Sequence, residues 1–98
     1  MSEDKLLKAR VDGSRARDLL SDELLQGALA ELKRAYAEKL LATSVSQSAE
    51  REILYQAHRI VGEFENHLRQ VLDNGKLADA ELNNLITIQE RKKRFGLI

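Results

Sequence analysis

The stretch from Ser48 to Asp73 constrains the fold most, because its apolar residues recur at alternating steps of three and four. This line of apolar residues consists of Leu54, Ala57, Val61, Phe64, Leu68 and Val71. The spacing predicts an amphipathic helix that packs lengthwise against another helix, and Ile53, Ile60 and Leu72 widen its apolar stripe. At 1.5 Å per residue this helix would be about 39 Å long, so a compact domain of this size cannot cover it completely. Its apolar face therefore calls for a second long helix and for a second chain.

The second long helix is predicted over residues 22–42. Its apolar positions are Leu25, Leu29, Leu32, Tyr36 and Leu40. Ser21 or Asp22 is expected to cap its first turn. Residues 43–47 are mostly hydroxyl-bearing or β-branched, and such residues compete with helical backbone hydrogen bonds. A short break between two amphipathic helices predicts an antiparallel hairpin formed by residues 22–42 and 48–73.

Side-chain size predicts how the two helices of this hairpin would meet. If the chain folds back at Val45 and Ser46, Phe64 lies opposite Gly27 and beside Ala28. In the same register Gly62 lies opposite Leu29. Large side chains would then face small ones on both helices, as close packing requires.

The ends of the chain are predicted to form short flanking helices. Asp12-Gly13-Ser14 is typical of a turn and would divide residues 1–20 into two short helices. Asp73-Asn74-Gly75 would end the long helix, with Gly75 in the left-handed position. A last helix is expected over residues 79–94, followed by an apolar tail at residues 95–98. The predicted fold is therefore a single all-α domain over residues 1–98, a long antiparallel helical hairpin with short flanking N- and C-terminal helices, completed by oligomerisation.

Composition excludes several classes of protein. The chain has no Cys, so no disulfide framework or thiolate site is expected, which suits a reducing compartment. No apolar run reaches 18 residues, and the first ten residues contain acids where a targeting segment needs bases, so we expect neither a membrane partner nor a signal peptide. The formal net charge is zero, so no overall field attracts nucleic acid.

Residues that could carry chemistry are few, and we predict no catalytic, cofactor-binding or metal site. His58 and His67 lie nine residues apart on one helix and point to different faces. Glu63 and His67 would form only half of a metal site, and neither zinc-protease nor di-iron spacing occurs. No nucleophile elbow or glycine-rich phosphate loop is present. The expected class is accordingly not an enzyme, and no cofactor is expected.

Two surfaces are candidates for binding. The predicted oligomer or partner interface consists of Ile53, Ile60, Leu72, Phe95, Leu97 and Ile98. The last three form the apolar tail, for which docking on a neighbour and disorder are both open. A basic cluster, Arg91, Lys92, Lys93 and Arg94, could contact nucleic acid, or could simply complement the negative C-terminal end of its own helix.

Several short segments carry a resemblance to a known group of proteins. They are Ala16 to Leu20, Leu29 to Leu32 with Tyr36, Arg51-Glu52 before Leu54-Tyr55, His67-Leu68 with Val71, and Asp73 to Ala78. Over about residues 15–82 the chain resembles short helical proteins of tailed phages and prophages that are encoded near DNA-packaging and head genes. The resemblance implies a role in virion assembly or packaging, and it brings no functional residues with it.

We therefore expect a non-enzymatic structural or adaptor protein that acts through helix-mediated contacts in phage particle assembly. Its partners would be further copies of itself, as a dimer or higher oligomer, and another phage protein. Its location would be the host cytoplasm during assembly, or the virion. Two alternatives remain open: a DNA-binding packaging component similar to a small terminase subunit, and a small inhibitor of a host protein.

Overall fold

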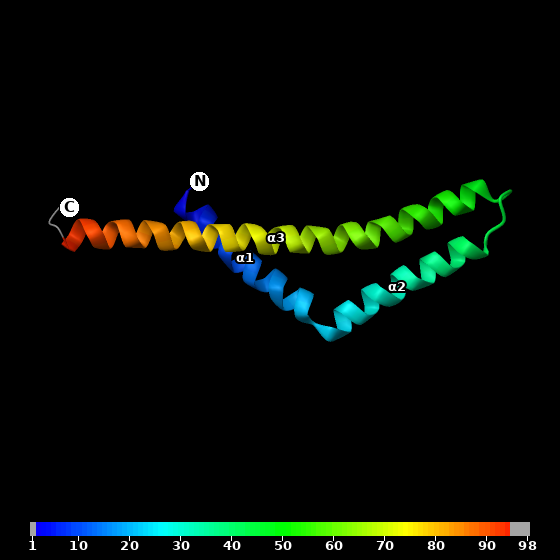
Figure 1. Ribbon diagram of the computed structural model, residues 1–98, viewed down its shortest axis with the longest axis horizontal. Helices are drawn as coiled ribbons and strands as arrows, with labels where there is room; N and C mark the ends of the chain where they lie inside the picture. Colours follow the sequence, from blue (N-terminus) through cyan, green and yellow to red (C-terminus); the bar gives the residue numbers. More distant parts are fainter. Residues whose placement is uncertain (1, 95–98) are drawn as a thin grey trace.

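The protein, described by a computed structural model over residues 2–94, consists of three helices and contains no strand in that range. Helix α1 spans Glu3–Ser21, α2 spans Glu23–Ala42 and α3 spans Ser48–Arg94 (Figure 1). This arrangement confirms the all-α class. The absence of Pro and the abundance of Ala, Leu, Glu, Lys and Arg explain why helix is the favoured state nearly everywhere.

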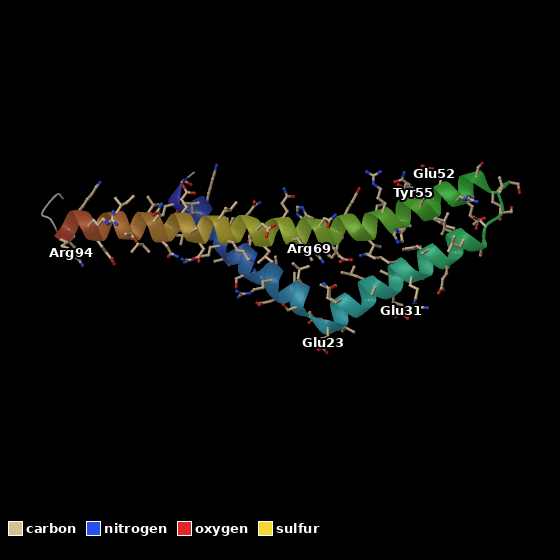
Figure 2. All side chains as sticks on the ribbon, in the orientation of Figure 1. Glu23, Glu31, Glu52, Tyr55, Arg69 and Arg94 are labelled. Carbon is tan, nitrogen blue, oxygen red and sulfur yellow. The ribbon has the colours of Figure 1, made fainter. Side chains whose placement is uncertain are left out.

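A single non-helical residue, Asp22, separates α1 from α2. Its Oδ1 atom accepts a hydrogen bond from the backbone N–H of Leu25 at 2.8 Å, which satisfies one of the unpaired donors of the first turn. The chain turns a sharp corner here, and Glu23 marks that corner in Figure 2. The expected cap at Ser21 or Asp22 is confirmed at Asp22.

Residues 43–47 connect α2 to α3. The hydroxyl of Thr43 donates to the Leu40 carbonyl oxygen at 2.6 Å, and the side chain of Gln47 accepts from the Ser44 N–H at 2.8 Å. These local bonds end α2 and hold the connection, as the composition of this segment predicts. Helix α2 then lies along the N-terminal half of α3 and runs in the opposite direction (Figure 1). We call this part of the molecule the α2–α3 arm.

Helix α3 is a single helix of 47 residues. The predicted end at Asp73-Asn74-Gly75 is wrong, and residues 79–94 continue α3 instead of forming a separate helix. The predicted turn at Asp12-Gly13-Ser14 is wrong as well, because α1 passes through it. Continuous long helices make the molecule elongated, with extents of 76 × 25 × 15 Å and a radius of gyration of 21.5 Å. A compact domain of this length has a radius of gyration of about 13 Å.

Gly13 and Gly75, where a turn and a helix end were predicted, lie where α1 crosses α3 (Figure 1). A Cβ atom on Gly13 would lie 2.6 Å from the Gly75 Cα, and a Cβ atom on Gly75 would lie 2.9 Å from the Ala9 carbonyl oxygen. No other residue fits at either position unless the two backbones separate. The close approach lets Leu6 pack against Ala78 and Leu82, which form the buried core. This packing offsets the roughly 1 kcal/mol that each glycine costs inside a helix.

The predicted register of large against small side chains in the α2–α3 arm is wrong. No heavy atom lies within 4 Å of a Cβ built on Gly27 or on Gly62, so neither glycine receives a bulky neighbour. Phe64 is 49% exposed and does not fill space in the arm. The two helices instead meet at Lys33 and Glu65, whose Nζ and Oε1 atoms lie 2.6 Å apart.

Candidate protein-interaction surface

The residues that face each other across the α2–α3 arm lie on one line along each helix, at alternating steps of four and three. The line on α2 comprises Leu29, Lys33, Tyr36 and Leu40, and the line on α3 comprises Leu54, His58, Val61, Glu65 and Leu68. Every one of these residues is buried or half-buried. This heptad spacing keeps two helices in contact over several turns.

The α3 contact line includes one charged residue that is almost fully buried. Glu65 is 8% exposed, and its carboxylate contacts Lys33 of α2 and, at 3.8 Å, Arg69 of its own helix. A buried carboxylate needs such partners, since desolvation otherwise disfavours the charge. The pair therefore places Lys33 of α2 opposite Glu65 of α3.

The residue that immediately precedes each contact residue is turned about 100° away from it around the helix. In two antiparallel helices that face each other, this same rotation brings both sets of preceding residues to one side of the pair. Most of these residues are apolar. The apolar ones are Ala28, Leu32 and Ala35 on α2 with Ile53, Ala57, Ile60 and Phe64 on α3, and we call this set the apolar flank. Lys39 and His67 are the polar residues in the same position.

The apolar flank has no partner within the described part of the chain. Ile53 is 69% exposed, Ile60 is 60% exposed and Phe64 is 49% exposed, while Leu32 and Ala28 are exposed on the neighbouring helix. Scattered exposed aliphatic residues are ordinary, but a contiguous set along two adjacent helices is typical of a protein contact surface.

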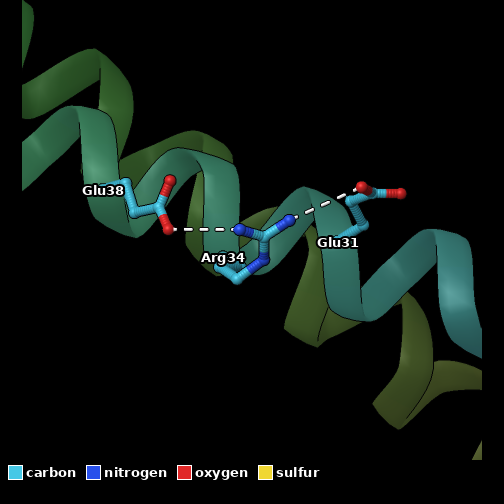
Figure 3. A network of polar contacts seen from close by, with 3 residues as sticks. All are labelled: Glu31, Arg34 and Glu38. Carbon is cyan, nitrogen blue, oxygen red and sulfur yellow. Dashed lines mark hydrogen bonds and ion pairs between the residues drawn. The ribbon is translucent and has the colours of Figure 1, made fainter.

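The opposite flank, made of the residues that follow the contact residues, is polar in its middle. Arg34 of α2 lies between Glu31 and Glu38 and contacts both, as Figure 3 shows. On α3, Arg59 pairs with Glu63 at 3.1 Å. Charged side chains that already have partners on their own helix suit a surface facing water. Two large apolar residues of this side, Leu41 and Tyr55, are exposed near the 43–47 connection. The two sides of the arm therefore differ in chemistry along their middle, and the apolar flank is the candidate site.

The flank ends where α1 replaces α2 against α3. Leu6, Ala9, Gly13 and Ala16 of α1, which are buried or half-buried, are preceded by Lys5, Lys8, Asp12 and Arg15, all charged and none buried. A groove of about 430 Å³ beside the glycine crossing is likewise lined partly by charged groups, among them Arg10, Arg17 and Lys76. The apolar flank thus ends with the arm, and the exposed apolar residues farther along α3, such as Leu77 and Ile86, do not belong to it.

The structure distributes the predicted interface residues unequally. Ile53 and Ile60 lie on the apolar flank, whereas Leu72 is half-buried and lines the groove at the glycine crossing. Phe95, Leu97 and Ile98 lie outside the described residues. Sequence reasoning missed Phe64, Ala57 and Leu32, which it assigned to the core. Two adjacent heptad lines run along α3, and the buried one contains a histidine and a glutamate. The predicted contact line took its apolar residues from both, with Leu54, Val61 and Leu68 from the buried line and Ala57, Phe64 and Val71 from its neighbour.

The basic cluster from Arg91 to Arg94 occupies the exposed last turn of α3. It lies at the end of the molecule opposite the 43–47 connection, where Figure 2 labels Arg94. Helix α3 extends past its last buried residue, Leu82, by twelve residues, and Leu85, Ile86 and Ile88 are exposed on this extension. The cluster and the apolar flank are therefore separate surfaces.

The chain matches no family model, no curated protein and no solved structure. Across residues 2–94, none of the helices carries the apolar stretch needed to cross a bilayer. The described residues also bring together no group of three or more side chains suited to hold a metal ion. The fold and surface define an elongated helical protein with one unpartnered apolar flank.

Proposed function

We propose that this protein is a non-enzymatic structural or adaptor component that acts by associating with further copies of itself through its helices. The observation that carries the proposal is the apolar flank of the α2–α3 arm. Leaving large aliphatic side chains such as Ile53 and Ile60 in water forgoes roughly 1.5–3 kcal/mol each relative to burying them. In this view the arm is one half of a helical bundle, and a second copy completes its core.

The setting we propose is assembly of a tailed-phage particle, in the host cytoplasm or in the virion, together with another phage protein. This part rests on the resemblance of residues 15–82 to short helical phage proteins. An elongated helical protein with an exposed apolar flank is well suited to join other components, because a long molecule offers a long contact surface for few residues.

Sedimentation equilibrium at tens of micromolar tests the proposal. The wild-type chain should sediment with at least twice its 11.1 kDa mass. Ile60→Glu places a charge on the apolar flank and should shift the mass toward the monomer, whereas Asn66→Glu on the opposite flank should leave it unchanged. A wild-type monomer throughout this range would refute self-association.

A second candidate function is DNA binding by the basic cluster. It is favoured by the exposure of four adjacent cations on an extension of α3, residues 83–94, in which every residue is exposed. Phosphate contacts by such a cluster depend steeply on salt. Sub-micromolar binding to duplex DNA that weakens with salt and disappears when Arg91 to Arg94 are neutralised would support this function. Binding that survives neutralisation would refute it.

A further inference from the structure

We infer that the occupant of the apolar flank is a second copy of this chain, related to the first by a two-fold axis that runs parallel to α3. The inference rests on the proposed function and deepens it by naming the surface and the geometry. In this arrangement α3 of each copy packs antiparallel on α2 of the other. The two 43–47 connections then lie at the same end of the dimer.

Side-chain size on the flank selects this axis. The α3 part of the flank carries the bulky residues Ile53, Ile60 and Phe64, whereas the α2 part carries Ala28 and Ala35 around Leu32. A two-fold axis parallel to α3 places the bulky row of each copy on the small row of the other. Both contacts are then large against small, which lets helices pack closely.

The other face-to-face arrangement has its two-fold axis perpendicular to α3. It places α3 on α3 and α2 on α2, so bulky side chains meet bulky ones while alanines meet alanines. The bulky side chains between the two α3 helices would hold the copies too far apart for the two α2 helices to come into contact. A gap along the α2 pair would forgo the packing that makes burial of the flank favourable.

Charge on the flank is compatible with a second copy. Lys39 precedes the contact residue Leu40, and Glu50 lies in the first turn of α3, where its carboxylate accepts a hydrogen bond from Gln47. Both charged residues lie near the 43–47 connection and are exposed, and neither forms an ion pair with another residue in the range 2–94. The axis parallel to α3 places Lys39 of each copy at the end where the partner copy carries its own Glu50. Such rim pairs contribute little affinity but favour one orientation over others.

The area of the flank sets how much of the arm a dimer must use. On α3 the flank runs from Ile53 to Phe64, which corresponds to about 18 Å, and two adjacent helices are about 20 Å wide, so its flat footprint is roughly 360 Å². Interdigitating side chains raise the buried area above this flat value. A standard protein interface buries about 800 Å² on each partner. The flank therefore forms the centre of the contact, and the residues around it complete the interface.

Single engineered cysteines test the geometry, because the natural chain has no Cys. Chains carrying Phe64→Cys should be mixed with chains carrying Ala28→Cys or Leu32→Cys, oxidised mildly and analysed by non-reducing electrophoresis. A covalent dimer should form in at least one mixture. Because random pairing of two variants makes half of all dimers mixed, the cross-linked fraction should not exceed one half. Chains carrying Phe64→Cys or Ile60→Cys alone should not cross-link, because equivalent α3 positions lie diagonally across the bundle. Ala30→Cys mixed with Asn66→Cys, on the opposite flank, is the matched control.

Each outcome decides the inference. Cross-linking in a Phe64→Cys mixture alone supports it, provided circular dichroism shows that the variants remain helical. Cross-linking of Phe64→Cys or Ile60→Cys with itself overturns it in favour of the perpendicular axis. No cross-link in a sample that sediments as a dimer also overturns it but leaves self-association standing. A monomeric wild-type chain overturns the inference and the proposed function together.

Discussion

The closest test of the fold is a pair of glycine-to-alanine substitutions in the same helix, Gly75→Ala and Gly62→Ala. Both replacements remove the helix penalty of glycine, which stabilises the folded state by about 1 kcal/mol. At Gly62 nothing lies within 4 Å of the new Cβ, so this gain should appear undiminished. At Gly75 the new Cβ would lie 2.6 Å from the Gly13 Cα and 2.9 Å from the Ala9 carbonyl oxygen.

Both atoms that the Gly75→Ala methyl meets belong to the backbone, so α1 must move as a whole. Overpacking of this kind typically costs about 1–3 kcal/mol. The helix gain is common to both variants and cancels in their difference, so Gly75→Ala should be less stable than Gly62→Ala by about 1–3 kcal/mol.

Thermal unfolding followed by circular dichroism at one fixed protein concentration measures this difference. For a chain of this size, 1 kcal/mol corresponds to about 4–8 °C in the unfolding midpoint. Gly62→Ala should unfold above the wild type, and Gly75→Ala should unfold at least about 4 °C below Gly62→Ala. Equal midpoints for the two variants would show that α1 and α3 do not cross at these glycines.

Two further predictions concern the free energy of unfolding. Leu6→Ala empties a position that is 1% exposed and should destabilise the protein by about 2–5 kcal/mol, whereas Leu24→Ala, at an 84% exposed position, should change stability little in urea titrations; equal effects would show that Leu6 is not in the core. Lys33→Ala leaves the buried Glu65 carboxylate with only the more distant Arg69 and should destabilise by about 1–3 kcal/mol, while Lys39→Ala should be nearly neutral. Lys33→Ala without effect would mean that the Glu65 carboxylate is solvated.

Local chemistry made much of the secondary structure predictable. The helix composition, the cap at Asp22 and the break at residues 43–47 depend on residues within one turn of each other, and all are seen in the structure. Gly13 and Gly75 were misread for the same reason. An Asp-Gly or Asn-Gly step is a turn signal when only its neighbours are considered. Whether such a glycine instead lies where two helices cross depends on a second backbone segment more than 60 residues away in the sequence.

The apolar flank was only partly predictable, because two heptad lines on α3 lie side by side. Spacing alone does not say which line faces α2. The line that faces α2 contains the buried charged residue Glu65, and its partner Lys33 lies on the other helix, where the spacing along α3 cannot reveal it. Ile53 and Ile60 were nevertheless predicted as interface residues, because they make the apolar stripe of the helix wider than one partner helix can cover. Both lie on the flank.

The central claim is that another copy of the chain covers the apolar flank, and one fluorescence measurement tests it most directly. The natural chain has no Trp, so Phe64→Trp places a single reporter on the flank. Its emission maximum should move to shorter wavelength as concentration rises from nanomolar to tens of micromolar, in step with the mass measured by sedimentation. Asn66→Trp, two residues away on the opposite flank, should not shift. Emission from Phe64→Trp that stays at the wavelength of a solvated indole at every concentration would contradict the account.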